Sequence, residues 1–122
     1  MNDNRRILLV DDEPNIVKII NRRLLSEGFE VLIAMDGIAA LEQARTGKPD
    51  LIILDVMLPK LNGYEVCRQL KQDTRYKKIP IIMLTALAQE SDEEFGLEMG
   101  TDAYIRKPFK AQQLLQKIRE LI

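Results

Sequence analysis

The chain has 122 residues, the usual size of a single domain, and 46% of them are hydrophobic while 30% are charged. This balance excludes an intrinsically disordered chain. Lys and Arg number 18 against 19 for Asp and Glu, so the net charge of -1 gives no electrostatic reason to bind nucleic acid or an anionic membrane. One Cys and no His exclude an internal disulfide and imidazole chemistry, so any metal must be held by oxygen.

The N-terminal residues lead into only four apolar residues before an acidic pair, which is too short for a signal peptide or a membrane span. No repeat, low-complexity tract or linker interrupts the chain. We therefore expect one cytoplasmic domain covering residues 1–122.

Aliphatic runs alternate with helical patterns along the whole chain. Strands are expected at residues 7–10, 29–34, 51–54, 81–84 and 103–105. Helical spacing of apolar residues follows each strand, with helices expected from about residue 16 to Gly28, from Asp36 as cap to Gly47, and over residues 63–71, 89–99 and 111–121. The helix at 89–99 is acidic and poor in apolar residues, whereas Cys67 is expected in the core.

Five strand–helix units in this length predict an α/β fold with one parallel sheet covered by helices on both faces. The size of the chain and the lack of a Gly-rich turn favour a single doubly wound (βα)5 flavodoxin-like domain with strand order 2-1-3-4-5 over a dinucleotide-binding order. In that winding, ligands bind beyond the carboxyl ends of the first and third strands.

Polar residues stand at the expected carboxyl ends of four strands. Asp11 and Asp12 follow the first strand, Asp55 ends the third, Thr85 follows the fourth and Lys107 the fifth. Three carboxylates gathered on one rim repel one another unless a cation is present, so the pattern favours Mg²⁺, with Mn²⁺ as a substitute.

Each of these residues alone has an ordinary structural explanation. Asp12 could cap the first helix ahead of Pro14, and Asp55 or Thr85 could begin a turn. Lys107 could be a solvated surface charge. Their coincidence at matching strand ends is much harder to explain by chance than any single placement.

Motifs of distinct sequence occur in order along the whole chain: Val10-Asp11-Asp12, Leu54-Asp55-Val56-Met57-Leu58-Pro59, Asn62-Gly63, Leu84-Thr85-Ala86 and Tyr104-Ile105-Arg106-Lys107-Pro108-Phe109. As a set they resemble the receiver domains of two-component response regulators, the CheY-like family. The resemblance implies that Asp55 accepts a phosphoryl group from a phosphohistidine on a sensor histidine kinase or a phosphotransfer protein.

The resemblance also implies a ligand set for Mg²⁺. Asp12 would bind the ion directly, Asp11 mostly through water, Asp55 through one oxygen and Met57 through its backbone carbonyl. Met57 and Leu87 border the site in this family, and because both are apolar here we expect a long-lived phospho-form.

After transfer, the family scheme gives roles to residues on the later strands. Lys107 pairs with the phosphoryl group, the Thr85 hydroxyl moves toward it, and the small Ala86 leaves room. Tyr104 then swings inward and alters the surface of the fourth helix, fifth strand and fifth helix. The peptide bond of Lys107-Pro108 is cis in the family, but the sequence alone leaves its cis or trans state open.

The switching surface would act on a downstream effector or on an output domain, and a homodimer through it is left open. A haloacid-dehalogenase-type phosphatase is disfavoured, since it needs a second Asp where Met57 stands and a substrate cap. A flavin carrier is disfavoured because Asp11-Asp12-Glu13 would repel its phosphate. A receiver-like scaffold that is never phosphorylated remains as an alternative, although none of the key residues is lost. The expected role is therefore a signalling phosphoacceptor and not an enzyme acting on other substrates.

Overall fold

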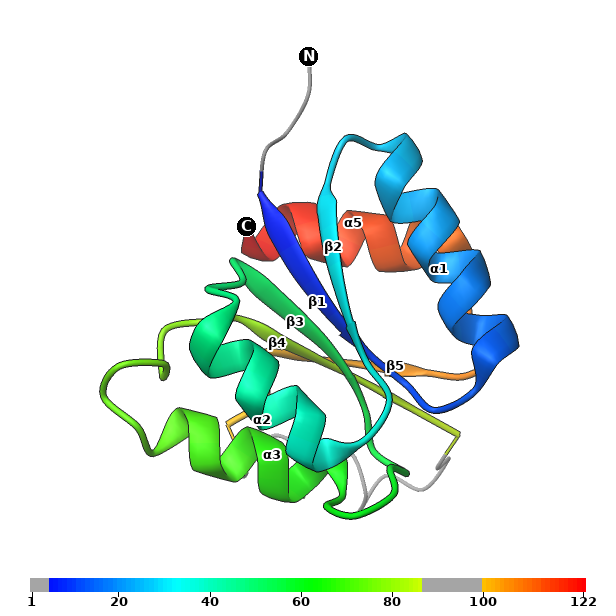
Figure 1. The fold of residues 1–122 in the computed structure, drawn as a ribbon. Coiled ribbons are helices and arrows are strands. Elements are labelled where there is room, and N and C mark those ends of the chain that lie inside the picture. Colours follow the sequence, from blue (N-terminus) through cyan, green and yellow to red (C-terminus); the bar gives the residue numbers. More distant parts are fainter. Residues whose placement is uncertain (1–4, 87–99) are drawn as a thin grey trace.

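The computed structural model describes residues 5–86 and 100–122 and contains one parallel sheet of five strands (Figure 1). The spatial order is β2-β1-β3-β4-β5, which confirms the predicted winding. The strands are β1 Arg6–Val10, β2 Glu30–Ala34, β3 Leu51–Asp55, β4 Ile81–Thr85 and β5 Ala103–Arg106. The helices within the described residues are α1 Pro14–Ser26, α2 Gly37–Thr46, α3 Gly63–Lys71 and α5 Ala111–Leu121. The helix expected at 89–99 lies outside them.

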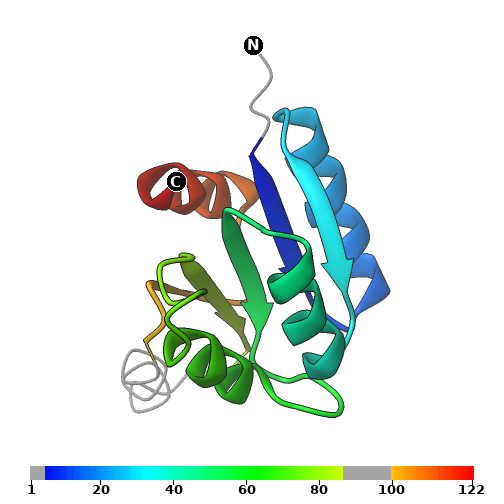
Figure 2. The same cartoon turned by 60° about the vertical axis from the view of Figure 1, so that its left-hand side comes forward.

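The helices cover the two faces of the sheet in pairs. Helices α1 and α5 lie on one face, and α2 and α3 lie on the other (Figures 1 and 2). Because side chains alternate along a strand, Ile7 and Leu9 pack on the α1 and α5 side while Leu8 and Val10 pack on the α2 and α3 side. This two-sided burial explains why the strands read as unbroken aliphatic runs.

Local side-chain chemistry fixes where the helices begin. The Asp36 carboxylate accepts a hydrogen bond of 2.8 Å from the Ala39 N–H and caps α2, as predicted. Helix α1 instead has Glu13 as its N-cap, followed by Pro14 at the first helical position. The structural alternative for Asp12 as the cap of this helix is therefore wrong, and Asp12 is left exposed.

The apolar stripes of the helices largely match the sequence pattern. In α3, Val66, Cys67 and Leu70 are buried as expected. In α2, Leu41 is buried but the Ile38 side chain is 53% exposed, because it lies at the helix start beyond the edge of the core. None of the helices in residues 5–86 and 100–122 is both long and apolar enough to span a bilayer.

Strands β3 and β4 extend one residue further than predicted, so each includes its terminal polar residue. The ladder continues because the Val56 N–H donates to the Leu84 carbonyl over 3.0 Å, and Asp55 pairs with Leu84 in register. Asp55 and Thr85 therefore belong to rigid, fully paired strand ends and not to loops.

Candidate functional site

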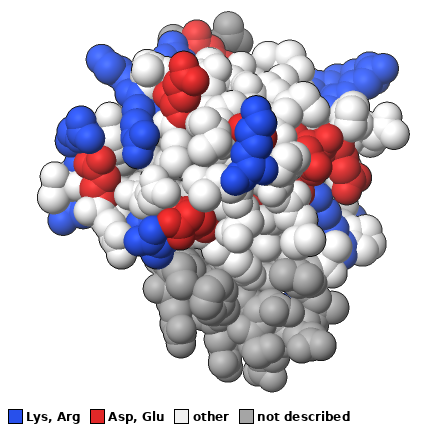
Figure 3. Space-filling view, turned by 60° about the horizontal axis from the view of Figure 1, so that its bottom comes forward, with Lys and Arg blue, Asp and Glu red and all other residues white. Residues whose placement is uncertain are grey.

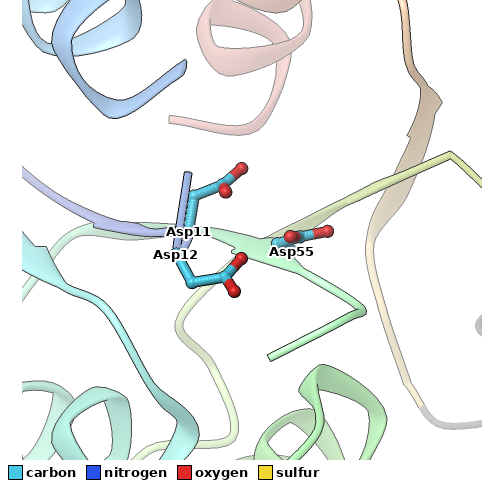
Figure 4. A group of neighbouring side chains, drawn as sticks. All are labelled: Asp11, Asp12 and Asp55. Carbon is cyan, nitrogen blue, oxygen red and sulfur yellow. The ribbon is translucent and has the colours of Figure 1, made fainter. Parts of the chain in front are cut away.

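Three carboxylates meet at the carboxyl end of the sheet. Strands β1 and β3 are parallel neighbours with Val10 beside Leu54, so the residues after Val10 lie next to Asp55. One oxygen from each of Asp11, Asp12 and Asp55 lies within 4.8 Å of the other two. Figure 4 shows the three carboxylates directed to the same side of the strand ends. The sequence prediction that these acids are brought together is confirmed.

The three acids differ sharply in exposure. Asp11 is fully buried, Asp55 is 4% exposed, and Asp12 is exposed to solvent. One Asp11 oxygen accepts a hydrogen bond of 3.0 Å from the Glu13 N–H, which orients that carboxylate. A buried carboxylate that keeps its charge needs a cation or several donors.

Lys107 supplies the cation within the protein. Its Nζ donates to Asp11 Oδ2 over 2.9 Å and lies 3.5 Å from Asp55 Oδ2, and its side chain is 13% exposed. Its backbone N–H donates to the Thr85 carbonyl over 2.6 Å, which ties this residue to the end of β4. The peptide bond between Lys107 and Pro108 is cis, which settles the state that the sequence left open.

The charges at this site do not balance. Burial acts to lower the pKa of Lys107, but its hydrogen bond with Asp11 and the charge of Asp55 raise that pKa overall, so the ammonium stays protonated. Burial, and then the charge of Asp11, raise the pKa of Asp55 to about 6, against the opposing effects of Lys107 and the backbone N–H of Met57. A single ammonium among three carboxylates thus leaves the site short of positive charge.

The donor set fits a hard divalent cation. In octahedral Mg²⁺ coordination with bonds of about 2.1 Å, ligand oxygens lie about 3 to 4 Å apart. The oxygens of Asp11, Asp12 and Asp55 need only a small contraction from their present separations to reach that geometry. Carboxylate oxygens are also the ligand type that such ions select. These residues can hold Mg²⁺ or Mn²⁺ without rearrangement of the strands.

The remaining predicted residues surround the carboxylates to different degrees. Thr85 is buried at the end of β4, in register with Arg106 and next to Lys107. Ala86 is exposed and lines a groove that also includes Lys107. The Met57 side chain is 64% exposed, and its backbone N–H contacts the Asp55 carboxylate. Leu87 lies outside the described residues.

Tyr104 lies on the edge strand β5, further from the carboxylates. Its ring packs against the core cluster on the α2 and α3 side of the sheet. Its hydroxyl is buried and has no hydrogen-bond partner among residues 5–86 and 100–122. Leaving a buried phenol hydroxyl without a partner is energetically unfavourable.

The structure explains why glycine follows Asn62 in the motif Asn62-Gly63. The Gly63 N–H donates to the Val56 carbonyl over 2.9 Å, and a Cβ at position 63 would overlap the Asp55 carbonyl oxygen. The start of α3 therefore packs directly on the backbone of the buried acid. The sequence signal was a Gly directly after the capping Asn62.

Charges of both signs are spread over the end of the molecule that carries this site. Figure 3 shows Lys and Arg interspersed with Asp and Glu over the described part of that face. The charge deficit at the three carboxylates is therefore local to the buried cluster, and is not part of a broad acidic surface.

Comparison with known proteins places this geometry in context. Residues 7–119 match the family described as "Response regulator receiver domain". The chain is 47% identical over 119 residues to the alkaline phosphatase synthesis transcriptional regulatory protein PhoP of Bacillus subtilis, covering 98% of this chain and 49% of the relative. It is 43% identical to the DNA-binding dual master transcriptional regulator RpaA of Synechocystis, covering 96% and 48%. The chain thus spans about half the length of these relatives.

Solved receiver structures share the fold. The receiver domain of sensor histidine kinase PA1611 from Pseudomonas aeruginosa, solved with a magnesium ion in its active site cleft, has a TM-score of 0.89 and 35% identity, covering 98% of each chain. The BeF3-activated receiver domain of Klebsiella pneumoniae RstA has a TM-score of 0.88 and 33% identity, covering 95% of this chain and 97% of that one. Family match, fold and site agree, and this chain belongs to the response-regulator receiver domain family of two-component signalling.

Proposed function

We propose that Asp55 is the phosphoacceptor of this receiver domain and that it takes the phosphoryl group from a phosphohistidine on a sensor kinase or phosphotransfer protein. One observation carries the proposal: Asp55 is a buried carboxylate with two further carboxylates beside it and an ammonium at 3.5 Å. A structural acid would be neutralised more completely, whereas an acceptor needs both a cation and room for an anion.

The transfer step balances within this site. One Asp55 oxygen forms the new O–P bond as the P–N bond of the donor breaks, and the imidazole leaves with the electron pair of that bond. Asp55 must be ionised to act as nucleophile, and with a pKa of about 6 it is ionised at neutral pH. Its place in a paired strand end holds the attacking oxygen in line.

Asp11, Asp12, Asp55 and the backbone carbonyl of Met57 are the residues that would hold Mg²⁺. The bound ion would neutralise charge on the phosphoryl oxygens during transfer. Asp11 and Asp55 are oriented before any ion arrives, the first by the Glu13 N–H and the second by the Met57 N–H. The site would therefore bind the ion with little reorganisation.

Three neighbours would receive the transferred group. Lys107, already 3.5 Å from Asp55, would exchange its contact with that carboxylate for one with a phosphoryl oxygen. The Thr85 hydroxyl, on the adjacent strand end, would donate to another oxygen. The exposed Ala86 leaves space beside it.

The signal would leave the site through Tyr104. Movement of Thr85 on β4 would alter the packing around Tyr104 on the neighbouring strand β5. The environment of the buried Tyr104 hydroxyl would change as a result. Phosphorylation need only favour one of two arrangements of β5 and α5 by a few kcal/mol. Residues 89–99, the other part of the predicted switching surface, lie outside the described residues. Formation of a homodimer through this surface would be one output of that change.

The output would be control of a partner or of a further domain. PhoP and RpaA are named as transcriptional regulators, and the chain corresponds to about half of each. We infer that this domain regulates an effector and does not itself contact nucleic acid. It would meet its donor in the cytoplasm, where a free thiol such as Cys67 stays reduced.

Turnover of an external substrate, as in a haloacid-dehalogenase-type phosphatase, has little support. The position that would carry the general acid is Met57, a thioether on an exposed side chain. The domain would then catalyse only its own phosphorylation and the slow loss of that group.

The test is incubation of the protein with acetyl phosphate and Mg²⁺, followed by intact mass spectrometry. We expect one added phosphoryl group, which Asp55→Asn and EDTA each abolish. Asp50→Asn serves as the matched control, because it removes an exposed carboxylate at the opposite end of β3. If neither acetyl phosphate nor a competent donor kinase modified the wild-type chain, the proposal would be contradicted. The alternative of a receiver-like scaffold that is never phosphorylated would then remain.

A further inference from the structure

The loop between β3 and α3, residues 56–62, is closed at two points. Its base is closed by the Gly63 N–H, which donates to the Val56 carbonyl over 2.9 Å. Its tip lies against the N-terminus of α2, where the Gly37 N–H donates to the Pro59 carbonyl over 3.2 Å. The loop that follows the phosphoacceptor is thus attached to a helix that contributes no residue to the site.

The contact at the tip is too close for a side chain. A Cβ at position 37 would overlap the carbonyl oxygen of Leu61 and lie 2.6 Å from the Leu61 Cβ. Glycine lowers helix stability by about 1 kcal/mol relative to alanine, so local propensity does not favour it as the first residue of α2. The absence of a side chain at this position is explained by the approach of the loop.

Two further features hold the same tip. Lys60 adopts a left-handed backbone with φ +68°, and its Nζ lies 3.5 Å from the carboxylate of Asp36, the N-cap of α2. The Leu61 N–H donates to the Pro59 carbonyl over 2.7 Å, which makes the turn tight. The loop is therefore held in one conformation by backbone contacts at both ends.

The beginning of this loop touches the site. The Met57 N–H contacts the Asp55 carboxylate, and the Met57 carbonyl is the proposed fourth ligand of the metal. Only three residues, 58 to 60, separate Leu61 from Met57 in this closed loop. Such outer contacts commonly change metal affinity by about 10-fold to 100-fold when they are lost.

We propose that Gly37 is a positioning residue for the phosphorylation site: it lets the β3–α3 loop dock on α2 and so holds the Met57 backbone in place for the metal and for Asp55. The inference rests on the proposed function, since it assumes that the three carboxylates bind Mg²⁺. It assigns to the N-terminus of α2 a part in the chemistry at Asp55.

The test compares Gly37→Ala with Gly47→Ala in the full chain. Both substitutions add one methyl to a crowded end of α2, since a Cβ at position 47 would lie 2.7 Å from the Gln43 carbonyl oxygen. Position 47 is at the helix end remote from the loop. Mg²⁺ affinity is measured by titration calorimetry, and exchange of the Leu61 and Gly63 amides is followed by NMR in metal-free protein.

We expect Gly37→Ala to weaken Mg²⁺ binding about tenfold and to speed exchange of both amides. Gly47→Ala lowers the melting temperature but leaves Mg²⁺ affinity and loop exchange at wild-type values. Wild-type affinity and exchange in a folded Gly37→Ala variant would overturn the proposal, as would equal losses of affinity in the two variants.

Lys60→Pro covers the case in which Gly37→Ala does not fold. Proline cannot adopt the positive φ of Lys60, so it displaces the loop tip without any substitution in α2, although the contact of Lys60 with Asp36 is also lost. We expect the same loss of Mg²⁺ affinity, and wild-type affinity would overturn the proposal. If the wild-type chain bound no Mg²⁺, that result would contradict the proposed function instead. Amide exchange alone would then decide whether Gly37 lets the β3–α3 loop dock on α2.

Discussion

Two lysine–aspartate clusters lie at opposite ends of the sheet and differ in how well their charges are matched. At the amino end, Lys71 donates to Asp102 over 2.8 Å and to the carbonyls of Lys77 and Ile79 over 3.1 and 2.8 Å, so each of its three N–H groups has an acceptor. Asp102 also accepts from the Ile81 N–H. One cation faces one carboxylate there.

At the carboxyl end, Lys107 is buried to nearly the same degree, with 13% of its side chain exposed against 15% for Lys71. It contacts two carboxylates, of Asp11 and Asp55, and a third carboxylate, of Asp12, lies beside those two. The two clusters use the same residue types at similar burial, but only one is short of positive charge. Charge balance, and not residue type, separates the structural ion pair of Lys71 from the proposed site for a cation and a phosphoryl group.

The largest expected effect comes from removing each lysine in turn. Lys107→Met should lower the free energy of unfolding by about 3 kcal/mol in metal-free buffer, since it leaves the buried carboxylate of Asp11 unpaired. Lys71→Met should lower it by about 1 kcal/mol, since the side chain of its partner Asp102 is 37% exposed. Saturating Mg²⁺ should remove most of the difference from wild type in Lys107→Met and leave the difference in Lys71→Met unchanged, with the wild-type protein measured at the same Mg²⁺ concentration. Urea denaturation with and without Mg²⁺ measures both, and an equal response to Mg²⁺ would remove the distinction between the clusters.

A smaller effect is expected from removing the charge of Asp55. Its pKa is raised from 3.8 to about 6, so the folded state holds the proton more tightly, and the ionised form destabilises the fold as the pH rises through this range. Asp55→Asn should therefore raise the free energy of unfolding by about 2 kcal/mol near pH 8. As the pH falls well below 3.8 the gain should vanish, because residue 55 is then uncharged in the folded and unfolded states of both proteins. A gain that does not depend on pH would argue against this account.

Removal of the exposed acid should have a milder consequence. Mg²⁺ should stabilise the wild-type protein by about 1 to 2 kcal/mol through binding to the folded state. Asp12→Asn should reduce that stabilisation while leaving the metal-free melting temperature within a degree or so, since Asp12 is exposed. Thermal melts with and without Mg²⁺ test this, with Asp50→Asn as the control, and an unchanged Mg²⁺ response in Asp12→Asn would exclude Asp12 as a ligand.

The smallest effect is expected at Cys67, which is buried but belongs to neither cluster. Burial raises the pKa of this thiol to about 11, so the reactive thiolate is scarce at neutral pH. A thiol reagent should label Cys67 only as fast as the protein unfolds. Rapid labelling of the native protein would show that the α3 side of the core opens locally.

Much of the fold followed from the sequence because its elements are fixed by local patterns. Aliphatic runs marked the five strands, and helical spacing marked α1, α2, α3 and α5. The placement of Asp11, Asp55 and Lys107 together also followed, since carboxyl ends of parallel strands share one edge. Within residues 5–86 and 100–122 the differences lie at helix starts: Glu13 caps α1, so the alternative of Asp12 as its cap is wrong, and Ile38 is exposed.

Contacts between distant segments were not predictable from such patterns. Lys71 and Asp102 are 31 residues apart, and nothing local to either marks their pairing. The approach of Leu61 to Gly37 likewise depends on how two loops meet. The hydrogen bond between Lys107 and Asp11 could not be predicted from either residue alone, because it depends on all the charges of the site.

The most direct test of the central claim is to locate the phosphoryl group. The protein is treated with acetyl phosphate and Mg²⁺, reduced with borohydride, which converts an aspartyl phosphate to homoserine, and then digested for peptide mapping. The account predicts homoserine at position 55, with Asp11 and Asp12 unmodified. Modification at either of those two residues, with Asp55 unchanged, would contradict it.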